Sequence, residues 1–397
     1  MSTLQLLEDL YTRKVMFSDL ELLWYREFAE QVVRTVLQEV QIHRRYGDPE
    51  IGREPIGTGS SFEGVKVKPE LEFDFMVPIQ INRPQIVFCD TDWNVPSRFG
   101  IVKTGSQQQF ELQSKSIWKK DEDFETKFCT DARGYGFLLS ADKIRKWFQS
   151  LCDQALPALE KSFPGSTFRF QQHDPARNLL VTKDGKELNI DIVPAIGYKN
   201  AFLVAKQCSS QINLPNEATW RLSLSTSERD FFEKMKSVLP YNSCHLKCLQ
   251  VLKYLRENDD QLCLSSHFTH GLRSYYLKTA LFHLVMESSP QAWAAGCLEQ
   301  RLREMIKYLI DRLGEGRIPH IYLGNQRHLG NPQWRLGVPV EFFRHTEANL
   351  LEGVNPDTVK QARLRLIQIS DNLEEILRQY LEEYLNGAES QSWCVVA

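Results

Sequence analysis

The sequence lacks any strong excess of charge of one sign. Its 48 basic and 51 acidic side chains leave a formal net charge of −3, and its isoelectric point is about 6.3. A nucleic-acid-binding protein of this composition needs a local basic patch, because the chain as a whole is not cationic.

Long hydrophobic stretches are also absent. No apolar run is long enough to span a bilayer, and acidic residues interrupt the opening MSTLQLLEDLYTRK where a signal peptide would be apolar. The nine cysteines are scattered rather than arranged as a compact disulfide framework, so we expect reduced thiols. Together these absences predict a globular protein of the cytoplasm.

Apolar periodicity divides the chain into an α+β half and a helical half. Ser18 and Glu21 form a capping-box pattern, which predicts the start of a long amphipathic helix that stops near Gly47. Strand patterns follow at 70–88, 167–170, 179–182 and 188–193, and helical patterns dominate from about residue 227. We therefore predict an α+β fold in three parts: a core lobe at 1–205, a helical lobe at 206–350, and a C-terminal helix with a flexible tail at 351–397.

The segment Glu72-Phe73-Asp74 places two acids on one face of a predicted strand. Side chains alternate along a strand, so the two carboxylates lie roughly 7 Å apart while Phe73 and Phe75 face the core. Asp191 has the same setting in the strand predicted at 188–193. If the two strands are neighbours, about 4.8 Å apart, three carboxylates converge. Such a triad can hold two Mg²⁺ or Mn²⁺ ions for in-line attack on phosphorus.

A glycine-rich turn shortly before the acid pair suits a phosphate. Gly59 lets the backbone approach a ligand closely, and backbone N–H groups with the Ser60 hydroxyl can hold a triphosphate. Solvent-facing strand acids and Gly-Ser pairs are common, so each element alone is weak evidence. Their order along the chain favours nucleotidyl transfer over a chance arrangement.

Four segments in order resemble one family. They are GTGSSFEGVKVKPELEFDFMVP at 57–78, TWRLSLS at 219–225, CLQVLKYL at 248–255 and SYYLKTALF at 274–282. The chain resembles the Mab-type nucleotidyltransferases, most closely cyclic GMP-AMP synthase and the cGAS-like receptors, over roughly residues 15 to 340. The resemblance implies a two-lobed nucleotidyltransferase fold, in which a mixed twisted sheet with a long spine helix is followed by a helical lobe and the active site lies between the lobes.

The resemblance also implies an activity. ATP and GTP would be joined in two steps into a cyclic dinucleotide that signals through STING in innate immunity. Glu72, Asp74 and Asp191 would be the catalytic, metal-binding acids. The nucleotide-binding residues would be Gly59 and Ser60 at the triphosphate, Arg221, Ser223, Ser225 and Glu228 on the base-reading segment, Lys253 and Lys278 at phosphates, Ser274 at the donor nucleotide, and Tyr275 stacked on a base. Taken alone, Tyr275 would more often be a core residue and Lys253 a solvated one.

The sequence departs from cyclic GMP-AMP synthase in the interval that carries a zinc-binding insertion in that enzyme. Here the interval is short and holds only Cys244, His245 and Cys248. Four tetrahedral ligands are not present, so we expect no zinc site. Loss of the insertion is typical of relatives that sense double-stranded RNA, which makes RNA the expected activator and DNA the less expected one.

Several basic clusters are candidates for contact with RNA phosphates, although each is more often ordinary solvated surface. They comprise His43, Arg44 and Arg45 at the end of the first helix, Lys115, Lys119 and Lys120, and Lys143, Arg145 and Lys146.

The chain ends in Cys394-Val395-Val396-Ala397, which fits a farnesyl-type prenylation box. The alternative is a cysteine that lies there by chance, and the two are about equally expected. One lipid chain without a polybasic segment would give only weak, reversible membrane association.

Two other functions stay open. The chain could be a non-catalytic Mab-type binding or developmental protein, which the three retained acids disfavour, or a nucleotidyltransferase that extends RNA ends. The bases of the product are also open, because Val193 is apolar where the vertebrate enzyme carries a hydroxyl residue.

Overall fold

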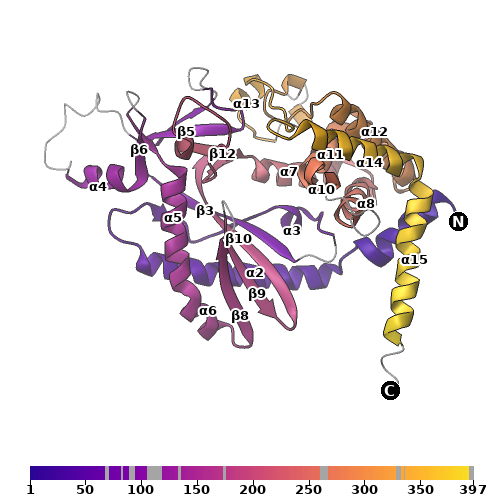
Figure 1. Ribbon diagram of the computed structural model, residues 1–397, viewed down its shortest axis with the longest axis horizontal. Coiled ribbons are helices and arrows are strands. Elements are labelled where there is room, and N and C mark those ends of the chain that lie inside the picture. The colour runs from indigo at the N-terminus through magenta and orange to yellow at the C-terminus, as the bar shows by residue number, and fades with distance from the viewer. Residues whose placement is uncertain are drawn as a thin grey trace.

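The structure is a computed structural model that describes residues 1–67, 71–81, 84–88, 94–104, 119–132, 136–172, 176–259, 267–327, 332–334 and 336–392. Within these residues a sheet-containing lobe and a helical lobe lie side by side (Figure 1). The expected α+β architecture is confirmed. Lys115 and Cys394 lie outside the described residues.

The first lobe is built on one mixed sheet. Its main path runs β1-β3-β10-β11-β12-β5-β7-β6, and β2, β4, β8 and β9 pair onto it from the side. The described strands are β1 Glu50–Ile51, β2 Ile56–Thr58, β3 Glu72–Gln80, β4 Pro84–Phe88, β5 Phe99–Thr104, β6 Cys129–Asp131, β7 Phe137–Leu139, β8 Ser166–Gln172, β9 Arg177–Lys183, β10 Lys186–Tyr198, β11 Ala201–Val204 and β12 Thr219–Ser223. β12 continues the sheet beyond residue 205, where the sequence predicted a lobe boundary.

The β3–β10 pair lies at the centre of this lobe and is parallel, whereas its neighbouring pairs are antiparallel. The alternating sequence of β3 buries Phe73, Phe75 and Val77 in the main core. The spine helix α2, Asp19–His43, contributes Val32 and Val36 to the same core and runs horizontally across the lower part of the lobe in Figure 1. The acids of β3 therefore lie on the face opposite the core.

The start of α2 differs in detail from the predicted capping box. Ser18 is the N-cap residue, but its side chain makes no capping hydrogen bond. Glu21, the expected reciprocal partner, forms an ion pair with Lys186 at the start of β10 instead. A tertiary ion pair replaces the local one, and the helix ends at His43, before Gly47.

The remaining helices of the first lobe flank the sheet. They are α3 Ser60–Glu63, α4 Lys119–Phe128, α5 Ala141–Cys152 and α6 Leu156–Ser162. The second lobe contains α7 Ser225–Val238, α8 His245–Glu257, α10 His267–Gly271, α11 Ser274–Glu287, α12 Leu298–Gly314, α13 Val340–Arg344, α14 Pro356–Asp371 and α15 Leu373–Ser392. None of the described helices combines the length and apolarity needed to cross a membrane.

The N-terminal segment ties the helical lobe to the spine helix. α1, Thr3–Leu10, lies beside α15, and a short π-helical turn at Tyr11–Val15 leads into α2 (Figure 1). The Tyr11 hydroxyl donates to Gln250 of α8 at 3.1 Å, and Lys247 pairs with Glu8 at 2.6 Å. One continuous stretch of chain thus contacts both lobes.

Candidate active site

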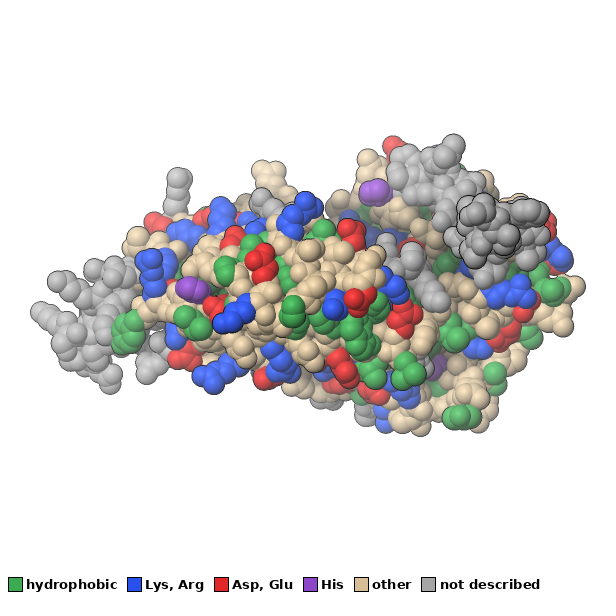
Figure 2. Space-filling view, turned by 90° about the horizontal axis from the view of Figure 1, so that it is seen from below, with side chains coloured by type: hydrophobic (Ala, Val, Ile, Leu, Met, Phe, Trp, Pro, Cys, Tyr) green, Lys and Arg blue, Asp and Glu red, His purple; other side chains and the backbone are tan. Residues whose placement is uncertain are grey.

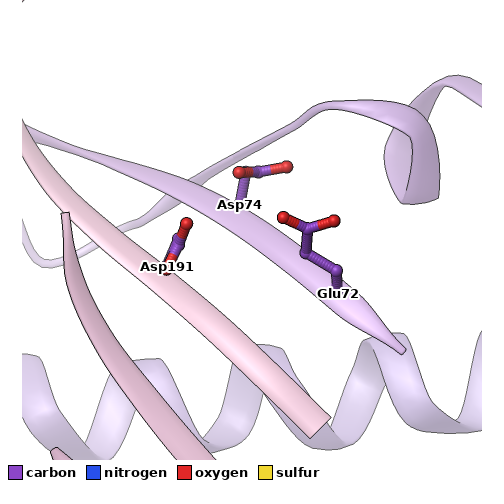
Figure 3. Close-up of side chains that lie close together, drawn as sticks. All are labelled: Glu72, Asp74 and Asp191. Carbon is purple, nitrogen blue, oxygen red and sulfur yellow. The ribbon is translucent and has the colours of Figure 1, made fainter. Parts of the chain in front are cut away.

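Three carboxylates meet where β3 and β10 pair. Asp191 lies directly opposite Asp74 in the parallel register, and Glu72 lies two residues before Asp74 on the same face. One ligand oxygen from each residue lies within 4.8 Å of the others. The close-up shows the three side chains converging from the two strands (Figure 3). The predicted adjacency of the strands is confirmed, and the triad it produces can hold a metal ion.

The carboxylates of the triad act on one another electrostatically. Burial, followed by the neighbouring carboxylates of Glu72 and Asp191, raises the pKa of Asp74 to about 7. Asn178 of β9 donates to Asp191 at 2.8 Å. The buried Lys66 ammonium lies 3.9 Å from the Glu72 carboxylate. A divalent cation with oxygen ligands fits this donor set and would relieve the repulsion, as Mg²⁺ and Mn²⁺ do.

The predicted phosphate turn lies beside the triad. β2 pairs with β3 so that Thr58 is opposite Asp74, and Gly59 follows with a φ of 77°. A Cβ at Gly59 would lie 2.3 Å from Asp74 Oδ2. Ser60 then begins α3, and the Ser61 hydroxyl donates to the Glu72 carbonyl oxygen at 2.6 Å. Only glycine allows this close contact between turn and carboxylate, so Gly59 fixes how near Ser60 comes to the metal-binding face.

The base-reading candidates lie at the junction of β12 and α7. Arg221 is exposed as a residue, but the protein around its guanidinium partly removes water from it. This desolvation, followed by the neighbouring Arg98 guanidinium, lowers the pKa of Arg221. The hydroxyls of Ser223 and Ser225 lie 3.1 Å apart. Two further candidates already have protein partners: Ser274 accepts from Arg256 at 3.0 Å, and the Lys253 ammonium lies 3.6 Å from Glu257.

Lys278, Glu228 and Tyr275 form one connected cluster with two residues that the sequence did not single out, Glu63 and His320. The Lys278 ammonium contacts the Glu228 carboxylate at 2.7 Å and the Glu63 carboxylate at 2.8 Å. The Tyr275 hydroxyl donates to Glu228 at 2.6 Å and lies 3.1 Å from His320 Nε2. The predicted phosphate lysine is therefore held between two carboxylates.

Sequence reasoning missed Glu63, Lys66, Asn178 and His320. Glu63 and Lys66 stand inside the GTGSSFEGVKV stretch, so their charge in an otherwise apolar and glycine-rich segment was an available signal. No local pattern marks Asn178 or His320, whose roles come from partners distant in the chain.

Two family models match the chain. The Mab-21 protein nucleotidyltransferase domain matches residues 61–234, and the Mab-21 protein HhH/H2TH-like domain matches residues 244–327. The chain belongs to the Mab-21 family. The nucleotidyltransferase match includes all three acids of the triad, and the second match includes Lys253, Ser274, Tyr275 and Lys278.

The Mab-21 chain is similar to two kinds of curated protein. It is 26% identical to the inositol 1,4,5-trisphosphate receptor-interacting protein of Takifugu rubripes, over 91% of this chain and 71% of that protein. The Danio rerio protein of the same name is 26% identical over 68% and 54%. Cyclic GMP-AMP synthase of Sus scrofa is 23% identical over 74% and 62%. The chain thus spans between about half and about seven tenths of the length of these relatives.

In this Mab-21 protein most of the predicted RNA-contacting cations are engaged within the fold. Lys143 donates to the Thr126 carbonyl at 3.3 Å, Arg145 is buried and pairs with Asp142, and Lys146 pairs with the same Asp142 at 2.7 Å. His43 lies 3.7 Å from Glu39, and Arg44 donates to the Asp48 carbonyl at 2.9 Å. The side chains of Lys119 and Lys120 lie outside the described ones.

The face of the molecule drawn in Figure 2 also carries its basic side chains among acidic ones. Figure 2 shows basic, acidic and hydrophobic side chains interspersed on it. Among the exposed hydrophobic residues of α2 are Leu20, Leu23 and Trp24. The described side chains of this face therefore carry basic groups without segregating them from acidic ones.

The residues of the short interval where the vertebrate enzyme carries zinc are part of the helical core. Cys244 and Cys248 are buried at the start of α8, and the Cys248 thiol lies 3.7 Å from the Leu298 carbonyl oxygen. His245 Nδ1 lies 2.9 Å from the Ser243 hydroxyl.

Proposed function

We propose that this Mab-21 protein is a metal-dependent nucleotidyltransferase that joins ATP, GTP or both into a cyclic dinucleotide when it senses double-stranded RNA. The observation that supports it is the triad of Glu72, Asp74 and Asp191. Its three carboxylates converge from two parallel strands, and the pKa of Asp74 is raised. Both features are expected of a metal site whose carboxylates repel one another when no metal ion lies between them.

Two Mg²⁺ or Mn²⁺ ions would lower the pKa of an attacking hydroxyl and stabilise the departing pyrophosphate. The protein's own part is positioning. Glu72, Asp74 and Asp191 supply the oxygen ligands, Gly59 and Ser60 hold the triphosphate beside them, and Tyr275 offers a ring face to a base. Arg221, Ser223 and Ser225 offer hydrogen-bonding groups to a base edge.

The biological setting follows from the same proposal. The cyclic dinucleotide would act on a STING-type receptor in the cytoplasm. Double-stranded RNA would bind through phosphate and 2′-hydroxyl contacts along the spine-helix side. If Cys394 is prenylated, the enzyme would associate weakly and reversibly with membranes.

The test is a product assay with the full chain. The protein is incubated with the four nucleoside triphosphates and Mg²⁺ or Mn²⁺, alone and with double-stranded RNA or double-stranded DNA. We expect a cyclic dinucleotide that appears with RNA and disappears in Asp191→Asn. Labelled material growing on the RNA would instead identify an end-extending enzyme, and product that persists in Asp191→Asn would overturn the assignment of the triad.

A second candidate is a binding protein without catalysis. It is favoured by the relatives named inositol 1,4,5-trisphosphate receptor-interacting proteins, whose name implies a protein partner. In that case the same assay gives no product with any polymer, while the chain binds the receptor. Binding of that receptor by wild type and by Asp191→Asn alike would support this candidate.

A further inference from the structure

The cluster around Lys278 connects both lobes of the protein. Glu63 lies on α3, three positions after Ser60, whereas Lys278 and Tyr275 lie on α11 and Glu228 on α7. Glu63 and Glu228 are 5% and 4% exposed, and the Lys278 side chain is 12% exposed. A lysine that joins two buried carboxylates from different elements fixes the distance between those elements.

The hydrogen-bond directions in the cluster are determined by His320. Its Nδ1 accepts from the backbone N–H groups of Tyr322 at 3.0 Å and Leu323 at 3.2 Å, so this nitrogen carries no proton. Burial lowers the pKa of His320 to about 3, so the ring is neutral and its proton is on Nε2. Nε2 therefore donates to the Tyr275 hydroxyl, which in turn donates to Glu228.

These directions leave only one part of Tyr275 for a ligand. Its hydroxyl is used by His320 and Glu228, and the Lys278 ammonium lies 5.3 Å from its ring centroid. Tyr275 as a residue is nonetheless only partly buried. Its ring is therefore held in a fixed orientation, as a stacking platform requires.

We propose that Glu63, Lys278, Glu228 and His320 are positioning residues that set the distance between the triphosphate-holding turn and the base-stacking ring. The path runs from Ser60 along α3 to Glu63, through Lys278 to Glu228, and on to Tyr275. One buried lysine thus determines whether a whole nucleotide spans both subsites. This proposal rests on the proposed function, because it assumes that a nucleotide binds at the turn and at the ring.

The proposed spacing role affects the binding of a whole nucleotide but not the binding of its fragments. Affinity for a ligand that spans two subsites depends on their spacing, whereas a fragment that binds one subsite does not sense it. We would measure calorimetrically the binding of α,β-methylene-ATP, adenosine and tripolyphosphate, each with Mg²⁺, to the full chain. The variants are Glu63→Ala, which removes the link, Glu63→Gln, which keeps an acceptor of the same size, and Glu63→Asp, which keeps the charge on a shorter side chain.

We expect Glu63→Ala and Glu63→Asp to weaken α,β-methylene-ATP binding about tenfold while changing adenosine and tripolyphosphate binding less than about twofold. Glu63→Gln should restore most of the affinity for the whole nucleotide. If Glu63→Ala fails to fold, the comparison of Glu63→Asp with wild type still tests the spacing role.

The matched control is Glu341→Ala. Glu341 also joins the two lobes, since it accepts from Tyr198 at 3.2 Å and pairs with Lys199, but these partners lie at the far end of β10 from Asp191. Its loss should leave binding of all three ligands unchanged.

Three results would overturn the spacing role while leaving the proposed function intact. These are wild-type affinity for the whole nucleotide in Glu63→Ala, equal weakening of all three ligands, and the same selective loss in Glu341→Ala. Failure of the wild-type protein to bind either α,β-methylene-ATP or α,β-methylene-GTP with Mg²⁺ or Mn²⁺, also in the presence of double-stranded RNA, would overturn the proposed function itself, and the spacing role with it.

Discussion

The triad of Glu72, Asp74 and Asp191 and the cluster around Lys278 differ in how their charge is matched. At the triad three carboxylates converge, and the Lys66 ammonium lies 3.9 Å from the carboxylate of Glu72. At the second cluster Lys278 lies directly between Glu63 and Glu228, at 2.8 and 2.7 Å. The triad can hold a metal cation between its carboxylates, whereas the second cluster already contains its own cation, the Lys278 ammonium. Converging carboxylates can thus take up a cation, and carboxylates already paired with a lysine link elements of the fold.

The largest expected effect comes from removing one acid of the unmatched cluster. Asp74→Asn should lower product formation by at least about 10²–10³-fold, because it removes a metal ligand at the reacting centre. The metal-free protein should become more stable, since the repulsion from Glu72 and Asp191 is relieved. Product analysis and thermal unfolding in a chelator measure the two effects. Asp184→Asn, in an exposed turn, should change neither. If the metal-free Asp74→Asn protein melted below wild type, the carboxylates of the triad would not be repelling one another as the comparison assumes.

The matched cluster should respond in the opposite way. Lys278→Met leaves two buried carboxylates without a cation and should cost about 3–5 kcal/mol of unfolding free energy. Adding Glu63→Gln should recover part of that loss, because it removes one of the unpaired charges. Urea unfolding measures both variants. Lys199→Met removes an exposed lysine from its pair with Glu341 and should leave stability nearly unchanged. Equal losses in Lys278→Met and Lys199→Met would show that burial of the pair does not matter.

A smaller effect tests the contact between the turn and the triad. Gly59→Ala should lose about 1–3 kcal/mol, because a φ of 77° with a ψ of −173° is a conformation that essentially only glycine adopts, and its Cβ would lie 2.3 Å from Asp74 Oδ2. Mn²⁺ binding, followed by calorimetry, should therefore weaken. Gly165→Ala has a similar φ of 81° but no atom within 4 Å of its Cβ. It should show the same loss of stability with unchanged Mn²⁺ affinity. If Mn²⁺ binding weakened in both variants, the contact with Asp74 would not be the cause.

The smallest effect is a pH dependence specific to the triad. The folded-state pKa of Asp74 is raised from 3.8 to about 7, so its contribution to metal-free stability is present below pH 4 and is lost as the pH rises to 7. Mn²⁺ must displace the same proton, so its affinity should fall as the pH drops below 7. Calorimetry and thermal unfolding from about pH 5.5 to 8 measure both trends. Asp74→Asn should flatten the stability trend, and a flat wild-type trend would contradict the charge state assigned to the triad.

The triad could be predicted from sequence because strand alternation is a local rule. The pattern of β3 fixes the face of Glu72 and Asp74, and that of β10 fixes the face of Asp191. Only the assumption that these strands are neighbours went beyond local reasoning, and the parallel register confirms it.

The Lys278 cluster could not be predicted, because its partners are remote in the chain. Glu63 and Lys278 are 215 positions apart, and no sequence pattern predicts that the two side chains meet. The Ser18 capping box fails for a related reason. Glu21 fits the local pattern but pairs with Lys186, 165 positions away. Charged residues take the best partner that the tertiary fold offers, and sequence patterns cannot rank remote partners.

The parallel pairing of β3 with β10 also has a consequence for synthesis on the ribosome. β1 and β2 pair with β3 along one edge and are already present when β3 emerges, but β10 follows only after roughly 120 further residues, or roughly 6–25 s at ~5–20 residues per second. During that time the other edge of β3 is open. Charged side chains on an open edge discourage pairing with other chains. We therefore expect Glu72 and Asp74, at the start of β3, to disfavour pairing of this edge with another chain until β10 has been made.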